Sequence, residues 1–366
     1  MSTPGPAQQL IDDAIAEGVI PGAVLMAGIG DAEPVLMHVA GDAQRDRDAR
    51  RPMSVETIFD LASLTKVVST LPCVLRLIAR GELGIDDPVC RYLTGFDGLG
   101  KDAVTVRQLL SHTSGLPDQR RYYEFLRGAT EIRAAALAEP LANSPGSVVC
   151  YSDVGFITLG ELCASVAGCT LDALVAELVC EPLGMTDTRY LPSAGLADRI
   201  ASTEQVGGVA KTGVVHDENA EAFGGVAGHA GLFGTAADLA RYAAAWAAGD
   251  AAGLAAAVQV PGWLAAEALR CQTYGLAASR GPGRRGLGWG LRGDGWDNMG
   301  DGWPATGAGH TGFTGTSLSI DPASGLWTVL LTNAVHFGRG PEHSVVGLRK
   351  QVHAVTAATL LDSVVQ

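Results

Sequence analysis

The sequence is poor in lysine, and its charge is unbalanced. The 26 lysines and arginines face 39 acidic residues, which gives a net charge of −13, and the four lysines are Lys66, Lys101, Lys211 and Lys350. A surface of this sign repels polyphosphates, so we do not expect a nucleic acid partner. Because lysine is rare here, a lysine at a special spacing is more informative than usual.

Several patterns that define other protein classes are missing. The seven cysteines form no C-x-x-C pair and no cysteine–histidine spacing typical of zinc, so we expect reduced thiols, no metal and no cofactor. No serine lies in a G-x-S-x-G sequence, which excludes the nucleophile turn of α/β-hydrolases. No basic segment followed by an apolar run precedes Asp12, and glycine and proline interrupt the longest uncharged stretches. We therefore expect a cytoplasmic protein without a membrane partner.

What is present has the composition of a globular enzyme. The chain has 366 residues, of which 47% are hydrophobic and 18% charged, enough for two domains or one large two-part domain. A helix is predicted at 7–17 and an antiparallel strand pair at 22–28 and 34–40. Strands are predicted again near the C-terminus, at 288–292, 309–313, 317–320 and 326–331. A closing helix follows at 342–361.

Helical patterns dominate between the two groups of strands. They occupy 63–80, 105–111, 153–167, 171–179 and 239–248. The capping spacings Thr105/Gln108 and Thr235/Asp238 mark two helix starts, and Pro72 should kink the first helix.

The predicted fold class is α/β (α+β). We expect an antiparallel sheet built from the N- and C-terminal segments and flanked by helices, with an inserted, mostly helical region. The predicted domains are a sheet domain formed by 1–62 and 285–366 and a helical region at 63–284, with the active site at their interface.

The strongest local signal is the pair Ser63 and Lys66. On a helix, positions i and i+3 share a face, so the hydroxyl and the ammonium can meet, and a serine in the first turn lies in the positive field of the helix N-terminus. A serine becomes a nucleophile when a base takes its proton, and a lysine can be that base if its surroundings lower its pKa. Apolar neighbours such as Leu64 and Val67 argue against a simple surface pair.

Two further motifs carry polar groups suited to acyl chemistry. Tyr151 opens a predicted helix, where a phenol near a serine and an ammonium can relay a proton; alone it is an ordinary residue at a helix start. His310 and Thr311 lead into Gly312 on a predicted strand. A glycine there lets a substrate approach the backbone, and an exposed N–H can serve as half of an oxyanion hole. The simpler alternative is a glycine-rich bend.

In type, order and separation these motifs resemble those of the serine β-lactamase and penicillin-binding-protein superfamily. The resemblance extends from Ile20 to Phe337, and the tyrosine makes the chain similar to the class C branch with its esterases, D-amino-acid amidases, peptidases and acyltransferases. It implies a β-lactamase/transpeptidase-like fold. The matching sequences are TIFDLASLTK at 57–66, LLSHTSGLP at 109–117, YSDVGF at 151–156 and GVAGHAGLF at 225–233.

The resemblance implies a role for each motif residue. Ser63 is the acylated nucleophile, Lys66 and Tyr151 form a coupled general-base pair, and the backbone N–H groups of Ser63 and Phe313 form the oxyanion hole. Which of Lys66 and Tyr151 holds the proton in each step stays open, because strongly coupled groups titrate as a pair.

The implied substrate-binding residues are Asp153, His310, Thr311 and Gly312, and two of them depart from the family pattern. Asp153 stands where asparagine is common, and an ionised carboxylate can only accept hydrogen bonds. His310 stands where β-lactamases and carboxypeptidases have lysine. This histidine removes a fixed positive charge that would meet a substrate carboxylate.

Other candidates have weaker support. We interpret His112 as a structural residue at a helix C-terminus, His229 as a turn residue that could line the site, and 216–218 as a solvated loop. An aromatic mouth is expected to gather four residues, namely Tyr122, Tyr123, Trp289 and Trp303.

The predicted function is serine-dependent hydrolysis or transfer of an acyl group, from an ester or amide of a small intracellular metabolite. The acceptor is water or, alternatively, an amine or alcohol. The second hypothesis is a β-lactamase or D-Ala-D-Ala carboxypeptidase, and the third is an inactive binding relative. The missing export signal favours the first, and the joint presence of Ser63, Lys66 and Tyr151 argues against the third. The acyl donor, the acceptor and the oligomeric state are left open.

Overall fold

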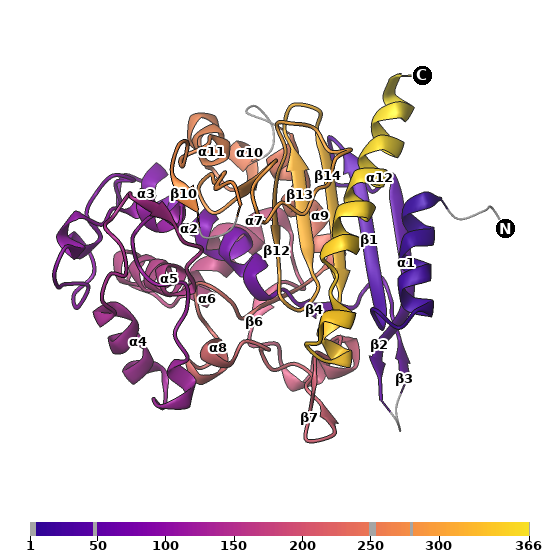
Figure 1. The fold of residues 1–366 in the computed structure, drawn as a ribbon, viewed down its shortest axis with the longest axis horizontal. Helices are drawn as coiled ribbons and strands as arrows, with labels where there is room; N and C mark the ends of the chain where they lie inside the picture. Colours follow the sequence, from indigo (N-terminus) through magenta and orange to yellow (C-terminus); the bar gives the residue numbers. More distant parts are fainter. Residues whose placement is uncertain (1–4, 47–49, 249–253, 279–280, 366) are drawn as a thin grey trace.

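The computed structural model describes residues 5–46, 50–248, 254–278 and 281–365. Within these residues the largest sheet has seven strands, in the order β11-β12-β13-β14-β1-β2-β3, and every neighbouring pair is antiparallel (Figure 1). Its strands are β1 (Gly22–Ile29), β2 (Leu36–Arg45), β3 (Arg50–Pro52), β11 (Gly290–Leu291), β12 (Ala308–Thr311), β13 (Ser317–Asp321) and β14 (Leu326–Thr332).

The two ends of the chain meet at the centre of this sheet. Val24 of β1 lies opposite Leu331 of β14 on one side and opposite Val39 of β2 on the other. The predicted hairpin of β13 and β14 is present, with Asp321 opposite Leu326. The predicted fold class, an antiparallel sheet made of N- and C-terminal segments, is therefore confirmed.

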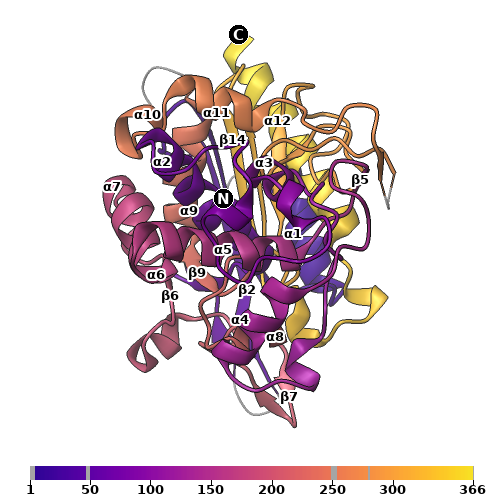
Figure 2. The same ribbon diagram turned by 90° about the vertical axis from the view of Figure 1, so that its left-hand side faces the viewer.

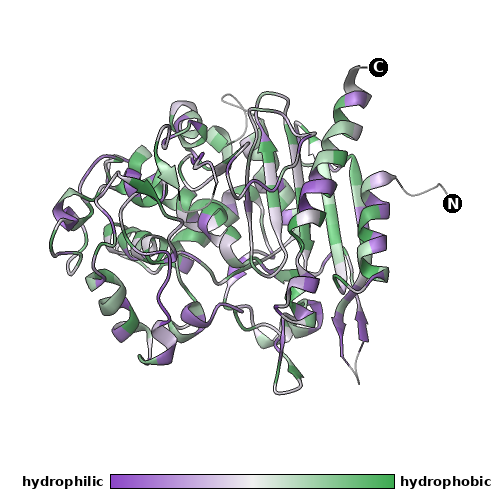
Figure 3. Ribbon diagram, viewed as in Figure 1, coloured by the Kyte–Doolittle hydropathy of each residue, from purple (hydrophilic) through white to green (hydrophobic). Residues whose placement is uncertain are grey.

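Helices cover both faces of the sheet. Helices α1 (Pro6–Ala16) and α12 (Val346–Val365) pack together on one face, and α9 (Ala236–Ala247) packs on the other against β14, β1 and β13 (Figure 1). Because both faces are covered, β1 is apolar along almost its whole length rather than alternating. Figure 3 shows hydrophilic residues gathered instead at the far ends of β2 and β3.

The inserted region lies beside the sheet, in front of it in Figure 2. Its helices are α2 (Leu71–Ala79), α3 (Val106–Leu110), α4 (Ala129–Ala138), α5 (Asp153–Ala167), α6 (Leu171–Val175), α7 (Glu181–Leu183), α8 (Glu218–Ala222), α10 (Leu254–Ala257) and α11 (Gly262–Leu269). Its short strands form three small sheets: β9 (Leu232–Thr235) and β6 (Arg189–Tyr190) with β4 (Ile58–Asp60), which precedes the region; β5 (Val148–Val149) with β10 (Ala277–Ala278); and β7 (Gln205–Val206) with β8 (Val209–Ala210).

The helix starts follow the local signals in the sequence. Thr105 and Thr235 are the N-caps of α3 and α9, where their side chains accept the backbone N–H groups of Gln108 and Asp238. The closing helix begins at Val346, four residues later than predicted. Residues Pro341–His343 form a separate 3₁₀ turn, which ends in an extended residue and interrupts the helical path.

The helix predicted from residue 63 is divided into three parts. A 3₁₀ turn (Ala62–Leu64) leads into a π-helical turn (Lys66–Thr70), and regular α-helix begins at Leu71. Pro72 has no N–H for the carbonyl four residues earlier, so the regular ladder cannot continue through this point. A second π-helical turn (Ala176–Cys180) stands in the same position before Pro182.

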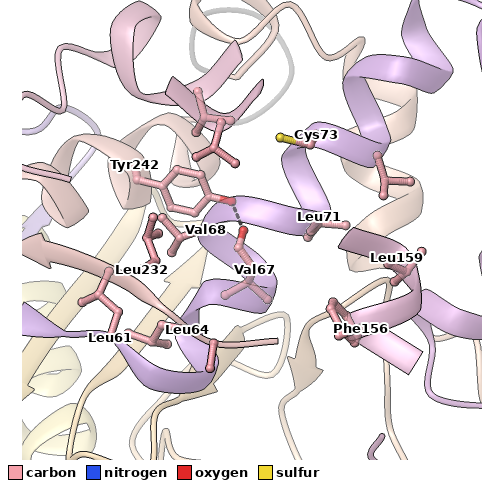
Figure 4. Close-up of a cluster of buried hydrophobic side chains, with 14 of the residues drawn as sticks. Leu61, Leu64, Val67, Val68, Leu71, Cys73, Phe156, Leu159, Leu232 and Tyr242 are labelled. Atoms are coloured by element: carbon pink, nitrogen blue, oxygen red, sulfur yellow. Dashed lines mark hydrogen bonds between the residues drawn. The ribbon is translucent and has the colours of Figure 1, made fainter. Parts of the chain in front are cut away.

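The π-helical turn is fixed by packing on the helical side of the molecule. The Tyr242 hydroxyl of α9 donates to the Val67 carbonyl, and apolar side chains surround the turn (Figure 4). The window Ala62–Ala79 has the length and hydropathy of a membrane span, but 83% of it is buried inside the protein. A buried core helix of a globular protein can have the same length and hydropathy, and Figure 4 shows this segment packed in the core.

Candidate active site

Ser63 lies on a tight turn between strand β4 and the helical segment. The preceding residue, Ala62, has a φ of 47°, which is rare for a residue with a side chain. The Asp60 carboxylate accepts the Ala62 N–H at 2.8 Å and so holds this backbone in place. The strained turn presents the Ser63 side chain, which is half-buried, at the end of the strand.

Lys66 joins Ser63 to two other parts of the chain. Its side chain is fully buried, and its Nζ lies 2.9 Å from Ser63 Oγ, 3.1 Å from the His229 carbonyl oxygen and 2.7 Å from Asp153 Oδ1. The spacing of three residues therefore brings Ser63 and Lys66 together as predicted. His229 contributes through its backbone, and its Nε2 contacts Asp217 at 3.0 Å.

The charge on Lys66 differs from the one that a lysine base needs. Burial lowers the pKa of Lys66, but the Asp153 carboxylate and the Tyr151 phenol outweigh burial, and the net result is a raised pKa. In the free site Lys66 is therefore an ammonium that donates to Ser63 Oγ. The condition set from the sequence for a lysine base, a lowered pKa, is not met.

Tyr151 is positioned by the loop that precedes α5. The next residue, Ser152, is the N-cap of α5, and its backbone N–H donates to His112 Nδ1 at 3.0 Å. The His112 ring lies 4.5 Å from the Tyr151 ring between centroids. Burial holds the pKa of His112 well below its usual value. His112 is thus a neutral side chain that supports Tyr151, which agrees with the structural role predicted for it.

Three cationic or aromatic groups surround the Tyr151 ring on its other sides. Lys66 Nζ lies 5.0 Å and Arg285 Cζ 5.5 Å from the ring centroid. The Trp296 ring lies 6.1 Å away. The phenol oxygen itself is 3.5 Å from His310 Nε2. Tyr151 therefore connects the helical side of the site with strand β12.

His310 is a neutral group in this structure. Its Nδ1 lies 2.9 Å from the Thr311 carbonyl oxygen, which can only accept, so Nδ1 carries the proton and Nε2 faces Tyr151 as an acceptor. Burial, and then the charges of Lys66 and Arg285, hold the pKa of His310 well below its usual value. From the sequence we expected that His310 leaves this position without a fixed positive charge. The geometry is consistent with that expectation.

The turn after β12 is locked against the turn that carries Ser63. Thr314 Oγ1 donates to the Asp60 carbonyl at 2.8 Å, and Thr316 Oγ1 to the Leu61 carbonyl at 3.1 Å. A Cβ on Gly312 would come within 2.4 Å of the Leu61 oxygen, so glycine is required here. Within the described residues the N–H groups of Ser63 and Phe313 have no hydrogen-bond acceptor. Two free donors thus stand on adjoining segments, as an oxyanion hole requires.

The predicted aromatic mouth is wrong. Trp289 packs in the core against Trp246, Trp303 packs on His353, and Tyr122 is buried with its hydroxyl on Glu139. Tyr123 is half-buried, and its backbone N–H donates to Asn219.

The aromatic residues that do lie at the site are Trp296, beside Tyr151, and Phe313, with exposed fractions of 48% and 62%. Trp296 also lines a small pocket with Tyr151 and the ion pair of Arg285 and Asp294. No sequence motif marks these positions, since contacts between distant segments bring them here.

The expectation of a solvated loop at 216–218 is also wrong for its first residue. His216 is buried, its N–H donates to Asp60 Oδ2 at 2.6 Å, and its ring stacks on Phe313 with centroids 5.7 Å apart. Asp217 caps helix α8. The polar residues at 216–218 suggested that this loop is exposed to solvent, but the chain packs beneath the site at His216.

Asp153, His310, Thr311 and Gly312 all lie around Ser63 and Tyr151, and their contact with a substrate stays a prediction. Asp153 Oδ1 is engaged by Lys66. Among the described residues no group of three histidine, cysteine, aspartate or glutamate side chains is arranged to hold a metal ion.

Comparisons with known proteins identify the family and the fold of the chain. The sequence profile of the Beta-lactamase family matches residues 7–347. A protein of Escherichia coli O157:H7 named "Putative D-alanyl-D-alanine carboxypeptidase" is 33% identical over 312 residues, which cover 76% of this chain and 70% of that protein. An N-acetylmuramyl-L-alanine amidase of Bacillus subtilis (strain 168) is 32% identical over 366 residues, covering 90% and 80%. The solved structure of EstCE1, a hydrolase with promiscuous acyltransferase activity, shares the fold with a TM-score of 0.74 at 22% identity, covering 96% and 97%.

Proposed function

Because the chain belongs to the β-lactamase family, we propose that it is a serine hydrolase or transacylase that forms an acyl-enzyme on Ser63 from an ester or amide. The observation that carries this proposal is the buried Lys66 ammonium, which lies 2.9 Å from Ser63 Oγ beside two free backbone N–H donors. A nucleophile, a proton-handling pair and an oxyanion site are the parts that acyl transfer needs.

We assign the proton transfer from Ser63 to Tyr151. Lys66 is already protonated in the free site and cannot accept a second proton, and its Nζ lies 5.0 Å from the centre of the Tyr151 ring, beside the group to which we assign the Ser63 proton. As Ser63 Oγ bonds to the substrate carbonyl carbon, its proton passes to Tyr151, which acts in its phenolate form, and the phenol so formed then gives a proton to the leaving alcohol or amine. The carbonyl oxygen receives the electron pair and points to the N–H groups of Ser63 and Phe313.

We further propose that the substrate is uncharged near the scissile bond. Each cation at the site is already engaged or enclosed: Lys66 by Asp153, and Arg285 by Asp294 at 2.9 Å. His310 is neutral. A neutral ester or amide therefore suits the site better than a penicillin or a peptide ending in D-alanine. The second hypothesis keeps support from the names of the relatives, which include a carboxypeptidase and an amidase.

The acceptor and the location stay predictions. The same pair that deprotonates Ser63 can deprotonate water, an amine or an alcohol in the second step, by microscopic reversibility. The class C branch, an intracellular substrate and a cytoplasmic protein remain proposals from the sequence.

The test is intact-mass analysis after incubation with p-nitrophenyl esters, β-lactams and D-amino-acid amides. We expect an acyl adduct with the esters, which Ser63→Ala abolishes together with turnover. Ser165→Ala is the control, since this serine is exposed on the far part of α5 and should change neither. An adduct that persists in Ser63→Ala would refute the assignment. Added amines and alcohols then show whether transfer products replace the free acid.

A further inference from the structure

The strand side of the site contains a buried cation that the proposed mechanism does not use. Arg349 lies in the first turn of α12, on the face of the sheet opposite α9, and is only 7% exposed. Its Nη2 donates to the carbonyl oxygen of Gly312 at 2.5 Å. The guanidinium thus reaches the turn after β12 from the side of helix α12.

In the part of the chain that the structure describes, Arg349 has no acidic partner. Among the described residues no carboxylate forms an ion pair with it, and its Nε has no hydrogen-bond partner. Burial lowers the pKa of Arg349 to about 10, which leaves it charged at neutral pH. A buried charge without a counter-charge costs stability, so a site that keeps one calls for a functional reason.

The contact of Arg349 suggests that reason. The Gly312 carbonyl and the Phe313 N–H belong to one peptide unit, in which resonance couples the oxygen and the nitrogen. A cationic donor on the oxygen draws electron density from the nitrogen, so the N–H becomes a stronger donor; hydrogen-bonded chains strengthen one another in this way. The Phe313 N–H is the group assigned to the oxyanion hole, and it has no other acceptor among the described residues.

The same peptide is also held in one orientation. The Gly312 oxygen accepts a second bond from the Gly315 N–H at 3.2 Å, and the N–H of the preceding peptide, that of Gly312, donates to the Thr316 carbonyl oxygen at 2.8 Å. Arg349 closes this arrangement from α12, so the carbonyl points to the helix and the Phe313 N–H points the opposite way along the planar peptide.

We propose that Arg349 is a positioning residue of the oxyanion hole, which orients and polarises the Gly312–Phe313 peptide and adds a fixed positive charge behind the developing oxyanion. The proposal rests on the proposed function of the site. It assigns to helix α12, outside the three sequence motifs, a part in stabilising the transition state.

The test compares Arg349→Met, Arg349→Gln and Arg349→Lys with the wild type on a p-nitrophenyl ester. We expect kcat to fall by about 10- to 100-fold in the two neutral variants with KM little changed, a smaller loss than removing the oxyanion donor itself. The lysine variant should recover part of the rate. The inhibition constant of phenylboronic acid, whose tetrahedral serine adduct places an oxygen in the oxyanion hole, should rise by a similar factor.

Stability separates this role from a structural one. Replacing an unpaired buried charge by a side chain of similar volume is often neutral or stabilising, so Arg349→Met should melt at or above the wild-type temperature while kcat falls. His353→Gln is the matched control. It alters a buried residue one turn further along α12, which contacts Ser317 at 2.9 Å, and it should leave kcat unchanged.

Each outcome decides the proposal. Wild-type kcat and boronate inhibition in both neutral variants would overturn it, and so would equal losses in His353→Gln. If Arg349→Met does not fold, Arg349→Gln gives the same comparison. If the wild type forms no adduct with either ester or boronate, the proposed function itself fails. That result is distinguishable, because it does not depend on Arg349.

Discussion

Two buried cations of the site, Lys66 and Arg349, have opposite surroundings. Lys66 touches Ser63 and is paired with a carboxylate at 2.7 Å. Arg349 touches only a backbone carbonyl and has no acidic partner among the described residues. The charge of Lys66 depends on neighbours that can exchange protons, whereas the charge of Arg349 is permanent at neutral pH. We call the side with Lys66, Tyr151 and Asp153 the helical wall, and the side with His310, Gly312 and Arg349 the strand wall. The difference assigns proton transfer to the helical wall and fixed electrostatic stabilisation to the strand wall.

The walls themselves differ in the same sense. Tyr151 lies just before helix α5 and Asp153 is its first residue, and both side chains face Lys66. On the strand wall, His310 is neutral, and the reactive group is the backbone around Gly312. A side chain can accept and release a proton, but a backbone N–H can only donate. Variants that act on one wall should therefore leave the function of the other intact.

The largest effect that tests this division is expected for Tyr151→Phe. Deleting a positioned base should lower kcat/KM for a p-nitrophenyl ester by roughly 10²–10⁴-fold. The ring stays, so its contacts with His112 and Trp296 should preserve the fold. Steady-state kinetics and a thermal melt give the answer. Activity close to that of the wild type would mean that the helical wall does not handle the proton through Tyr151.

A change in pH dependence is the next effect in size. Asp153→Asn removes the largest influence that raises the pKa of Lys66, so burial should then lower that pKa. If Lys66 acts as an ammonium, the variant loses activity at a lower alkaline pH than the wild type, by about one unit or more, where one unit equals ~1.4 kcal/mol. If Lys66 instead acts as a neutral base, the variant gains activity near neutral pH.

The proposed mechanism requires the first result, and a gain near neutral pH would transfer the base role to Lys66. Asp118→Asn is the matched control, because Asp118 is exposed and its backbone oxygen, not its side chain, accepts the Asp153 N–H. Its pH–rate profile should equal that of the wild type.

Apart from the sheet built from the N- and C-terminal segments, the features that the sequence predicts correctly are local. The caps at Thr105 and Thr235 and the contact between Ser63 and Lys66 each depend on residues three positions apart. Helix geometry alone places such pairs together. The apolar pattern of a strand is also a local signal. A strand such as β1 is apolar throughout when both faces of the sheet are covered, and it alternates when one face is covered.

The features that the sequence does not reveal depend on contacts between distant segments. Arg349 reaches Gly312 across 37 positions, and Phe313 stacks on His216 from another part of the chain. The aromatic mouth was assigned to large residues such as Trp289, which are the ones that a core buries most readily. The pairing of Lys66 with Asp153 could have been suspected from the unusual aspartate, since a carboxylate near a buried ammonium attracts it.

The smallest effect is expected on the strand wall, from His310→Lys. The change restores a cation at the position where the sequence resembles carboxylate-binding relatives, and it should raise kcat/KM for benzylpenicillin relative to a neutral p-nitrophenyl ester. Burial and the charges of Lys66 and Arg285, which hold the pKa of His310 down, would also lower the pKa of a lysine there. We therefore expect a gain of only about fivefold, equal to ~1 kcal/mol for a partly screened ion pair. Since a lysine is charged below its pKa, the gain should grow as the pH falls from 9 to 6. Steady-state kinetics on both substrates over this pH range measure it. A gain of a hundredfold or more would mean that the site already accommodates a substrate carboxylate, and the preference for neutral esters and amides would then be wrong.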